Sequence, residues 1–210
     1  MLFKSPPFAL IDTETTGLSP QRDSIVEIAV VTLNTHFSEI GRWHTLVNPK
    51  RPIPNCRIHG VTQDMVAHAP TFAAVLPELL AQLDGKILLA HNAKFDSSML
   101  LAETERVTNA DLYFPFVDTL RLVRQILPSG TSCSLDSLLR HTRVRNDLAH
   151  SALGDAVATG RMLHALFGKR RGEIGRKIRS NADVFNAGIA NLPTTPETVA
   201  YPRRKPDTTC

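Results

Sequence analysis

Two carboxylates at the end of an apolar run are the residues of this chain best suited to chemistry. Asp12 and Glu14 follow Phe8–Ile11, and side chains two residues apart in a strand point to the same face. Like charges about 4 Å apart repel by about 4 kcal/mol at an effective dielectric near 20. A fold keeps such a pair only if a cation, a proton or bulk water relieves the repulsion, so we searched for residues that complete a metal site.

Two more aspartates interrupt patterns that otherwise indicate burial. Asp96 lies in the first turns of a predicted helix, just after a short apolar strand, and Asp155 lies early in a long apolar helix. A carboxylate on the core-facing side of a helix start is unfavourable unless it is paired or bound to a metal. We therefore expect Asp96 and Asp155 to converge with Asp12 and Glu14 at the end of the first strand.

This set of residues favours one kind of chemistry. Hard carboxylate oxygens select Mg²⁺ or Mn²⁺ rather than zinc, and two such ions about 4 Å apart can clamp the attacking and leaving oxygens of a phosphodiester. His150 precedes Asp155 by five residues. An imidazole in that place is suited to take the proton from an attacking water.

The elements that must position these residues alternate between strand and helix patterns. Strands are predicted at residues 8–12, 24–33, 39–47, 86–90 and 116–117, and helices at 62–66, 71–84, 93–105, 118–127, 135–141 and 148–167. The turn signals between the first three strands favour an antiparallel meander. Residues predicted to cap helices are Thr62, Thr71, Asp118 and Gly168. The order indicates a mixed α/β sheet with the first strand at its centre.

Composition and charge divide the 210 residues into three segments. Residues 1–168 carry a net charge of −1 and residues 169–210 a net charge of +5. We predict a catalytic domain over 1–168, a basic helical extension over 169–191, and a proline-rich, disordered tail over 192–210. The three scattered cysteines indicate reduced thiols. We see no secretory signal and no run long enough to span a membrane.

Three motifs resemble those of the DEDDh exonucleases, the family that includes the proofreading epsilon subunit of bacterial DNA polymerase III. They are Asp12-Thr-Glu-Thr-Thr-Gly17, His91-Asn-Ala-Lys-Phe-Asp96 and His150-x4-Asp155. Segments 58–62 and 117–120 also resemble parts of the family. The resemblance runs from about Phe8 to Phe167.

The resemblance implies a ribonuclease H-like fold, a mixed five-stranded sheet flanked by helices, and 3′→5′ removal of nucleotides with two Mg²⁺ ions per site. Asp12, Glu14 and Asp155 would hold one ion. Asp12 would bridge to the second ion, which Asp96 would support directly or through water. His150 would be the general base.

The resemblance also implies contacts to the substrate, a single-stranded 3′ end. The backbone around Thr13 and Thr15 would approach the terminal nucleotide, and Leu18 would wedge against its base. His59 and Asn92 would contact sugar or phosphate. Two further residues each allow two interpretations. Phe95 either lines the pocket or belongs to the core, and Gly154 either permits a close backbone approach or is simply tolerated within its helix. Asp118 is expected to be a structural helix cap.

The natural substrate stays open at this level. We expect a cytoplasmic enzyme that acts on single-stranded or frayed DNA 3′ ends in proofreading or repair, with a DNA polymerase subunit as a candidate partner. One alternative is a ribonuclease that trims RNA 3′ ends, but no residue identifies a partner for the 2′-OH. Another is a polymerase-associated subunit that acts mainly by docking through its basic segment.

Overall fold

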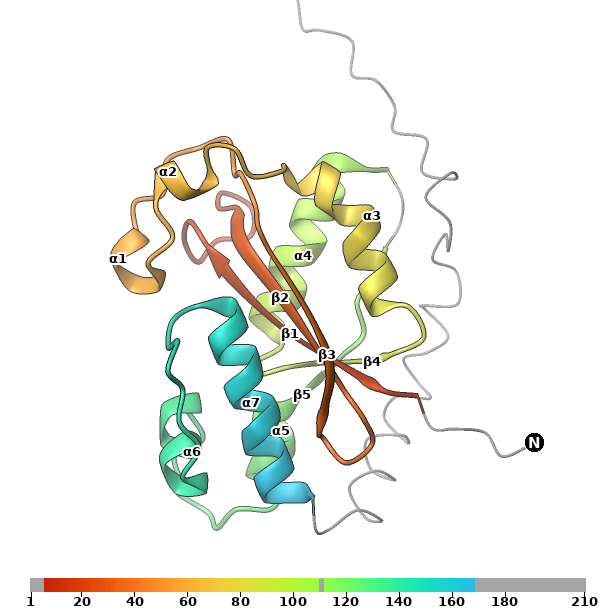
Figure 1. The fold of residues 1–210 in the computed structure, drawn as a ribbon, viewed down its shortest axis with the longest axis vertical. Coiled ribbons are helices and arrows are strands. Elements are labelled where there is room, and N and C mark those ends of the chain that lie inside the picture. Colours follow the sequence, from red (N-terminus) through yellow and green to blue (C-terminus); the bar gives the residue numbers. More distant parts are fainter. Residues whose placement is uncertain (1–5, 110–111, 169–210) are drawn as a thin grey trace, which may run out of the picture.

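The computed structural model describes residues 6–109 and 112–168, and its centre is a mixed five-stranded sheet (Figure 1). The strands are β1 (Phe8–Thr15), β2 (Ile25–Leu33), β3 (Glu39–Leu46), β4 (Ile87–Ala90) and β5 (Phe116–Asp118). Their order across the sheet is β3-β2-β1-β4-β5. The first three strands form the predicted antiparallel meander, and β4 and β5 run parallel to β1. The prediction of a central first strand is confirmed.

Strand β1 is paired unequally on its two edges. On one edge β2 pairs with it from Phe8 to Thr15, whereas on the other edge β4 pairs only with Phe8–Leu10. From Ile11 onward β1 therefore has no strand beside it on the β4 side. The backbone of the carboxylate motif lies along this open edge.

Helices cover both faces of the sheet. They are α1 (Cys56–His59), α2 (Gln63–Val66), α3 (Phe72–Leu83), α4 (Lys94–Val107), α5 (Thr119–Arg124), α6 (Leu135–Thr142) and α7 (Ala152–Phe167). The buried side chains of α3 and α4 form one core with the sheet, and those of α5, α6 and α7 form a second core on the opposite face. Helices α1 and α2 lie beyond the carboxyl end of β1 (Figure 1).

The predicted boundaries differ from the structure at several element ends. Strand β1 continues three residues past Asp12, because β2 pairs with it as far as Thr15. Helix α5 ends at Arg124 rather than residue 127, and α7 begins at Ala152 rather than 148. Helix α1 was not predicted. Both carboxylates of the opening motif therefore lie inside a paired strand rather than after it.

The predicted caps are confirmed in part. The side chain of Thr62 accepts a hydrogen bond from the Met65 N–H at the start of α2, as predicted. Thr71 occupies the N-cap position of α3, but its side chain makes no capping bond. Gly168 follows α7 with φ −55°, a right-handed conformation rather than a left-handed cap.

Two regions of the sequence prediction receive no structural description here. The basic extension at 169–191 and the tail at 192–210 lie outside the described residues. Among the helices that the structure does describe, each is too short or too polar to cross a bilayer.

Candidate active site

Three carboxylates meet at the carboxyl half of β1. Asp12 and Glu14 share the face of β1 that α7 covers, and Asp155 projects from the first turn of α7. One carboxylate oxygen from each of the three lies within 4.8 Å of the other two. Asp155 follows Glu14 by 141 positions and Asp12 by 143 in the sequence, yet the three side chains form one compact group of oxygen ligands.

Asp96 reaches the site from the opposite face of the sheet. It lies in the first turn of α4, its side chain is only 4% exposed, and one carboxylate oxygen accepts a hydrogen bond of 2.8 Å from the Thr13 hydroxyl. It is not part of the three-oxygen group. Its charge nevertheless raises the pKa of Asp12, so the two carboxylates are close enough to interact. The open edge of β1 permits this approach.

Burial and mutual repulsion make the group resist ionisation. Burial raises the pKa of Asp12 well above its usual range, and the charges of Asp96, Asp155 and Glu14 raise it further. Burial, then Asp155 and Glu27, raises the pKa of Glu14 to about 8. Burial also raises the pKa of Asp96 to about 7, against the opposing hydrogen bond from Thr13. Without a cation, these oxygens hold protons near neutral pH.

The residues present fit a divalent cation of the magnesium class. All of the nearby ligands are carboxylate oxygens, the donors that Mg²⁺ and Mn²⁺ prefer, and neither a thiol nor an imidazole belongs to the three-residue group. Because a cation would relieve the repulsion and displace the protons, its affinity for this group should rise with pH. The raised pKa values and the close oxygens are the observations that support a metal here.

A loop immediately before α7 places His150. This residue is exposed, has φ +62°, and is followed by Ser151, whose hydroxyl accepts a hydrogen bond of 3.1 Å from the Gly154 N–H. A Cβ at Gly154 would lie 2.0 Å from the Leu148 carbonyl oxygen. Of the two readings of Gly154, the structure therefore supports close backbone approach.

Asn146 is a site residue that the sequence did not reveal. Its side-chain NH₂ group donates a hydrogen bond of 2.5 Å to Asp155, and its side-chain Oδ1 accepts one of 3.2 Å from the Leu148 N–H. Burial raises the pKa of Asp155, and the hydrogen bond from Asn146 opposes that rise. Asn146 thus orients one carboxylate and braces the loop that carries His150.

Glu27 is a fifth carboxylate, also missed. It faces Glu14 directly across the β1–β2 pair and is only 4% exposed. One of its oxygens lies 2.6 Å from His44 Nε2, and the other accepts a hydrogen bond of 3.1 Å from the Ala152 N–H, at the start of α7. The sequence signal was an acid within the apolar run of β2. Its partners, on β3 and α7, could not be identified from that run.

The expected substrate contacts lie around this group. Thr15 donates a hydrogen bond of 2.7 Å to the Gly17 carbonyl, in a turn that leaves Leu18 83% exposed. His59 is 6% exposed, and its Nδ1 accepts from the Val61 N–H at 3.1 Å. Because burial lowers the pKa of His59, its neutral ring carries the proton on Nε2.

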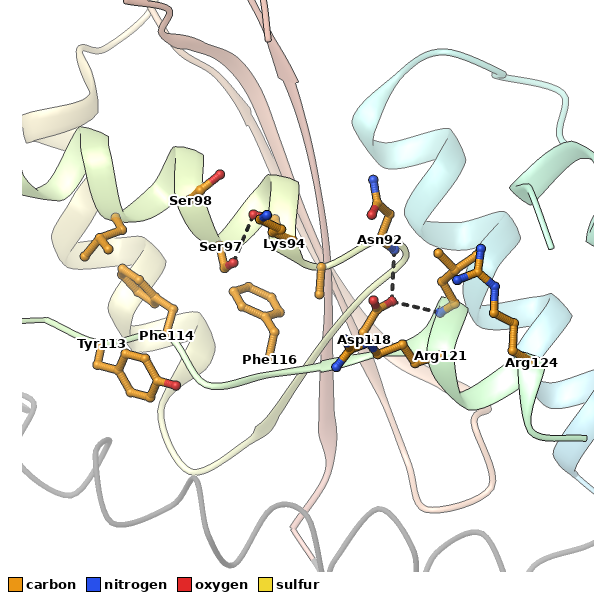
Figure 2. A pocket seen from close by; sticks show the side chains of 13 residues that line it. Asn92, Lys94, Ser97, Ser98, Tyr113, Phe114, Phe116, Asp118, Arg121 and Arg124 are labelled. Carbon is orange, nitrogen blue, oxygen red and sulfur yellow. Dashed lines mark hydrogen bonds between the residues drawn. The ribbon is translucent and has the colours of Figure 1, made fainter. Parts of the chain in front are cut away.

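Asn92 lies just before α4, and Phe95 lies in its first turn. Asn92 is exposed with φ +67°, and its N–H donates to Asp118 at 3.1 Å (Figure 2). Asp118 also accepts from the Leu120 N–H at 2.9 Å, so its predicted role as the cap of α5 is confirmed. Phe95 is half-buried against the core under α3 and α4. Asp118 therefore holds both the start of α5 and the backbone of Asn92.

Comparisons with known proteins agree with this arrangement. Residues 9–163 match the profile of a protein family described as "Exonuclease". The chain is similar to a DNA polymerase III PolC-type protein of Thermotoga petrophila, at 36% identity over 162 residues that cover 76% of this chain. It is also similar to a DNA polymerase III subunit epsilon-like protein of Rhodobacter capsulatus, at 39% identity over 175 residues, or 79% of this chain. The chain spans only 12% and 24% of the length of these two relatives.

Solved structures share the fold. Exonuclease X, in complex with 5′ overhanging duplex DNA, superposes with a TM-score of 0.62 at 28% identity, over 80% of this chain and 99% of that one. The nuclease domain of 3′hExo, a DEDDh family member bound to rAMP, gives a TM-score of 0.68 at 21% identity, over 80% of this chain and 94% of that one. The predicted ribonuclease H-like fold, a mixed sheet flanked by helices, is confirmed.

Proposed function

The chain belongs to the exonuclease family whose profile matches residues 9–163, and from that premise we propose that it is a 3′→5′ exonuclease dependent on divalent cations. Its substrate would be a single-stranded or frayed 3′ end, with DNA favoured. The observation that carries the proposal is the meeting of Asp12, Glu14 and Asp155 oxygens within 4.8 Å. This group lies on the half of β1 that β4 leaves open.

The carboxylates would hold two cations, Mg²⁺ or Mn²⁺. Asp12, Glu14 and Asp155 would hold one, and Asp12 and Asp96 would hold the second, directly or through water. Bound ions of this kind stabilise the charge that develops on the attacking and leaving oxygens of a phosphodiester. The hydrogen bond from Thr13 orients the Asp96 carboxylate for this task.

His150 would be the general base. Its exposure would let a water molecule reach the ring, and the loop fixed by Asn146 and by the close approach at Gly154 would hold the ring within electrostatic reach of Asp155. The ring would accept the proton of that water as the water oxygen bonds to phosphorus. The bond from phosphorus to the 3′ oxygen of the preceding nucleotide would break, and that oxygen would take a proton from solvent. Holding the base in place before the reaction lowers the entropic part of the barrier.

The remaining residues would hold the terminal nucleotide. The Thr13 and Thr15 backbone would contact it at the open edge of β1, and the exposed Leu18 would stack against its base. His59, through the proton on Nε2, and Asn92 would contact sugar or phosphate. Phe95 packs against the core and would shape the pocket wall rather than bind directly.

DNA is favoured over RNA, and polymerase association over a free-standing role, by the names of the relatives at 36% and 39% identity. RNA trimming and a mainly docking role are the alternatives. A cytoplasmic location belongs to the same proposal. Deletion of residues 169–210 followed by copurification of a polymerase subunit would test docking separately.

The test is Mg²⁺-dependent release of nucleotides by wild type and Asp12→Ala. We expect the variant to lose release while it keeps its circular dichroism spectrum, and the exposed Asp64→Ala to behave as wild type. Single-stranded DNA, duplex DNA with a mismatched 3′ end, and RNA should be compared. Faster release from RNA would reassign the substrate, and equal rates in Asp12→Ala and wild type would refute the metal mechanism.

A further inference from the structure

A hollow lies beside the candidate active site, and of its lining residues only Asn92 was assigned a substrate contact above. It encloses about 590 Å³ between α4, the segment that enters β5, and α5 (Figure 2). Ligand pockets typically enclose about 300–1,000 Å³. The side chains that matter here are Lys94, Tyr113, Phe116, Arg121 and Arg124.

The hollow is positively charged. Lys94, Arg121 and Arg124 line it, all are exposed, and none forms a salt bridge with another described residue. Asp118 is the acid in the lining, and its carboxylate already accepts hydrogen bonds from two backbone N–H groups. The described lining therefore carries three cations against one carboxylate, a formal net charge of +2 that attracts an anion from solution.

The other half of the hollow is aromatic. Tyr113 is 54% exposed, Phe116 is half-buried, and the buried Phe114 also lines the hollow (Figure 2). An exposed ring beside unpaired cations is the combination by which proteins hold single-stranded nucleic acid, since bases stack on rings while cations follow the phosphates. A purely acidic peptide would use the cations and leave the ring without a partner.

The hollow also lies at the carboxyl ends of the parallel strands, the same end of the sheet as the carboxylates. Asn92 follows β4, and Asp118 is the last residue of β5. Both strands run parallel to β1, and Ala90 at the end of β4 pairs with Asp118. With neighbouring strands 4.7–4.9 Å apart, β5 lies about 10 Å from β1. A strand whose 3′ end reaches Asp12 can therefore extend over Asn92 into the hollow.

We propose that this hollow, which we call the α4–β5 groove, binds the single-stranded segment on the 5′ side of the nucleotide being removed. Phosphates would contact Lys94, Arg121 and Arg124, and a base would stack on Tyr113. The proposal rests on the proposed exonuclease function and assigns its substrate-holding surface.

The test measures binding apart from catalysis. Fluorescence anisotropy of a 5′-labelled thymidine dodecamer, in chelator and at several salt concentrations, compares full-length wild type with Arg121→Gln/Arg124→Gln. The matched control, Arg51→Gln/Arg140→Gln, removes the same charge from exposed positions outside the groove. We expect the groove variant to bind about tenfold more weakly, with a log–log salt slope smaller by about 1.4, and the control to match wild type.

A second pair of variants tests stacking. Tyr113→Ala should weaken binding about fivefold or more, whereas Tyr113→Phe, which keeps the ring, should bind as wild type. A glutamate homopeptide of equal charge serves as a competitor. Displacement of the labelled strand by that peptide more readily than by unlabelled DNA would overturn the proposal and assign the groove to an acidic protein segment.

Hydrolysis of the nitrophenyl ester of thymidine monophosphate, with Mg²⁺, reports the catalytic centre alone. Binding that depends on Arg121 and Arg124 supports the groove, even if the ester is not hydrolysed and the proposed function fails. Ester hydrolysis together with strand binding that ignores both arginines supports the centre and overturns the groove.

Discussion

The carboxylate site on β1 and the α4–β5 groove lie at the same end of the sheet but are built in opposite ways. The site is partly buried, its acids repel one another, and a bound cation would relieve that repulsion. The groove is exposed, its cations form no salt bridge with another described residue, and its net positive charge favours binding of an anion. Partial burial fixes the carboxylates that would hold the cations, whereas exposure suffices for groups that only hold a flexible strand.

This contrast predicts that variants of the two regions differ in what they change. Variants of the carboxylate site should slow the nitrophenyl ester and the DNA strand alike, because both need the same centre. Variants of the groove should weaken binding of the strand alone.

Among variants that keep all four site carboxylates, the largest effect is expected for His150→Gln. Loss of a general base lowers rates by about 10²–10⁴, and we expect this fall for both substrates, with strand affinity in chelator unchanged. Steady-state rates and anisotropy measure the two quantities. A variant that lost affinity but kept its rate on the ester would place His150 with the groove rather than with the chemistry.

Gly154→Ala should come next. The added Cβ must displace the Leu148 backbone, from which it would lie 2.0 Å, and so move the loop that carries His150. A displacement of about 1 Å at a catalytic group lowers rates by about 10². Gly41→Ala, where the nearest atom would be 3.9 Å away, is the control. Equal rates in the two variants would show that the loop does not position the base.

Glu27 separates charge from position. Glu27→Gln keeps an acceptor for the Ala152 N–H but removes a charge that raises the pKa of Asp12 and Glu14. We expect about tenfold more Mg²⁺ to be needed for half-maximal activity, with a near-normal rate at saturation. Glu27→Ala also removes the acceptor, so saturating Mg²⁺ should not restore its rate. Restoration in both would limit Glu27 to an electrostatic role.

The smallest effect concerns stability without metal. The pKa of Glu14 rises to about 8 on folding, against about 4.3 in an unfolded chain. The folded state then binds more protons between these values, so stability falls as pH rises from about 4.5 to 8. Glu14→Gln removes that loss. Because solvent screens the charge of this partly exposed group, we expect Glu14→Gln to stabilise the metal-free protein by about 1–2 kcal/mol at pH 8.

Thermal unfolding in chelator, at pH values at the two ends of this window, measures the difference, which should vanish near the lower end. Glu78→Gln, at an exposed position of α3, is the control. Excess Mg²⁺ should reverse the order, because only wild type keeps the full ligand set. A stabilising effect of Glu14→Gln that is the same at both pH values would contradict the electrostatic explanation.

The carboxylate site could be predicted from the sequence because its signals are local. Asp12 and Glu14 share a strand face by their spacing, while Asp96 and Asp155 each begin a helix that must return to the sheet. The structure brings Asp12, Glu14 and Asp155 together and places Asp96 within electrostatic reach of Asp12.

Other features depend on contacts between distant segments. The extension of β1 to Thr15 requires pairing with β2, and the role of Glu27 requires Ala152, 125 residues away. The groove is formed by three segments. Two of them overlap the motifs at 91–96 and 117–120, but nothing in those motifs indicates that the segments meet in one groove. Periodicity and spacing describe one element at a time, so they could not reveal these features.

The most direct test of the central claim uses a single-stranded DNA labelled at its 5′ end and protein stripped of metal. Addition of Mg²⁺ should produce a ladder that shortens from the 3′ end one nucleotide at a time, with no product in chelator and none from Asp12→Ala. Products formed without a divalent cation, or release of the 5′ label as the first product, would contradict it.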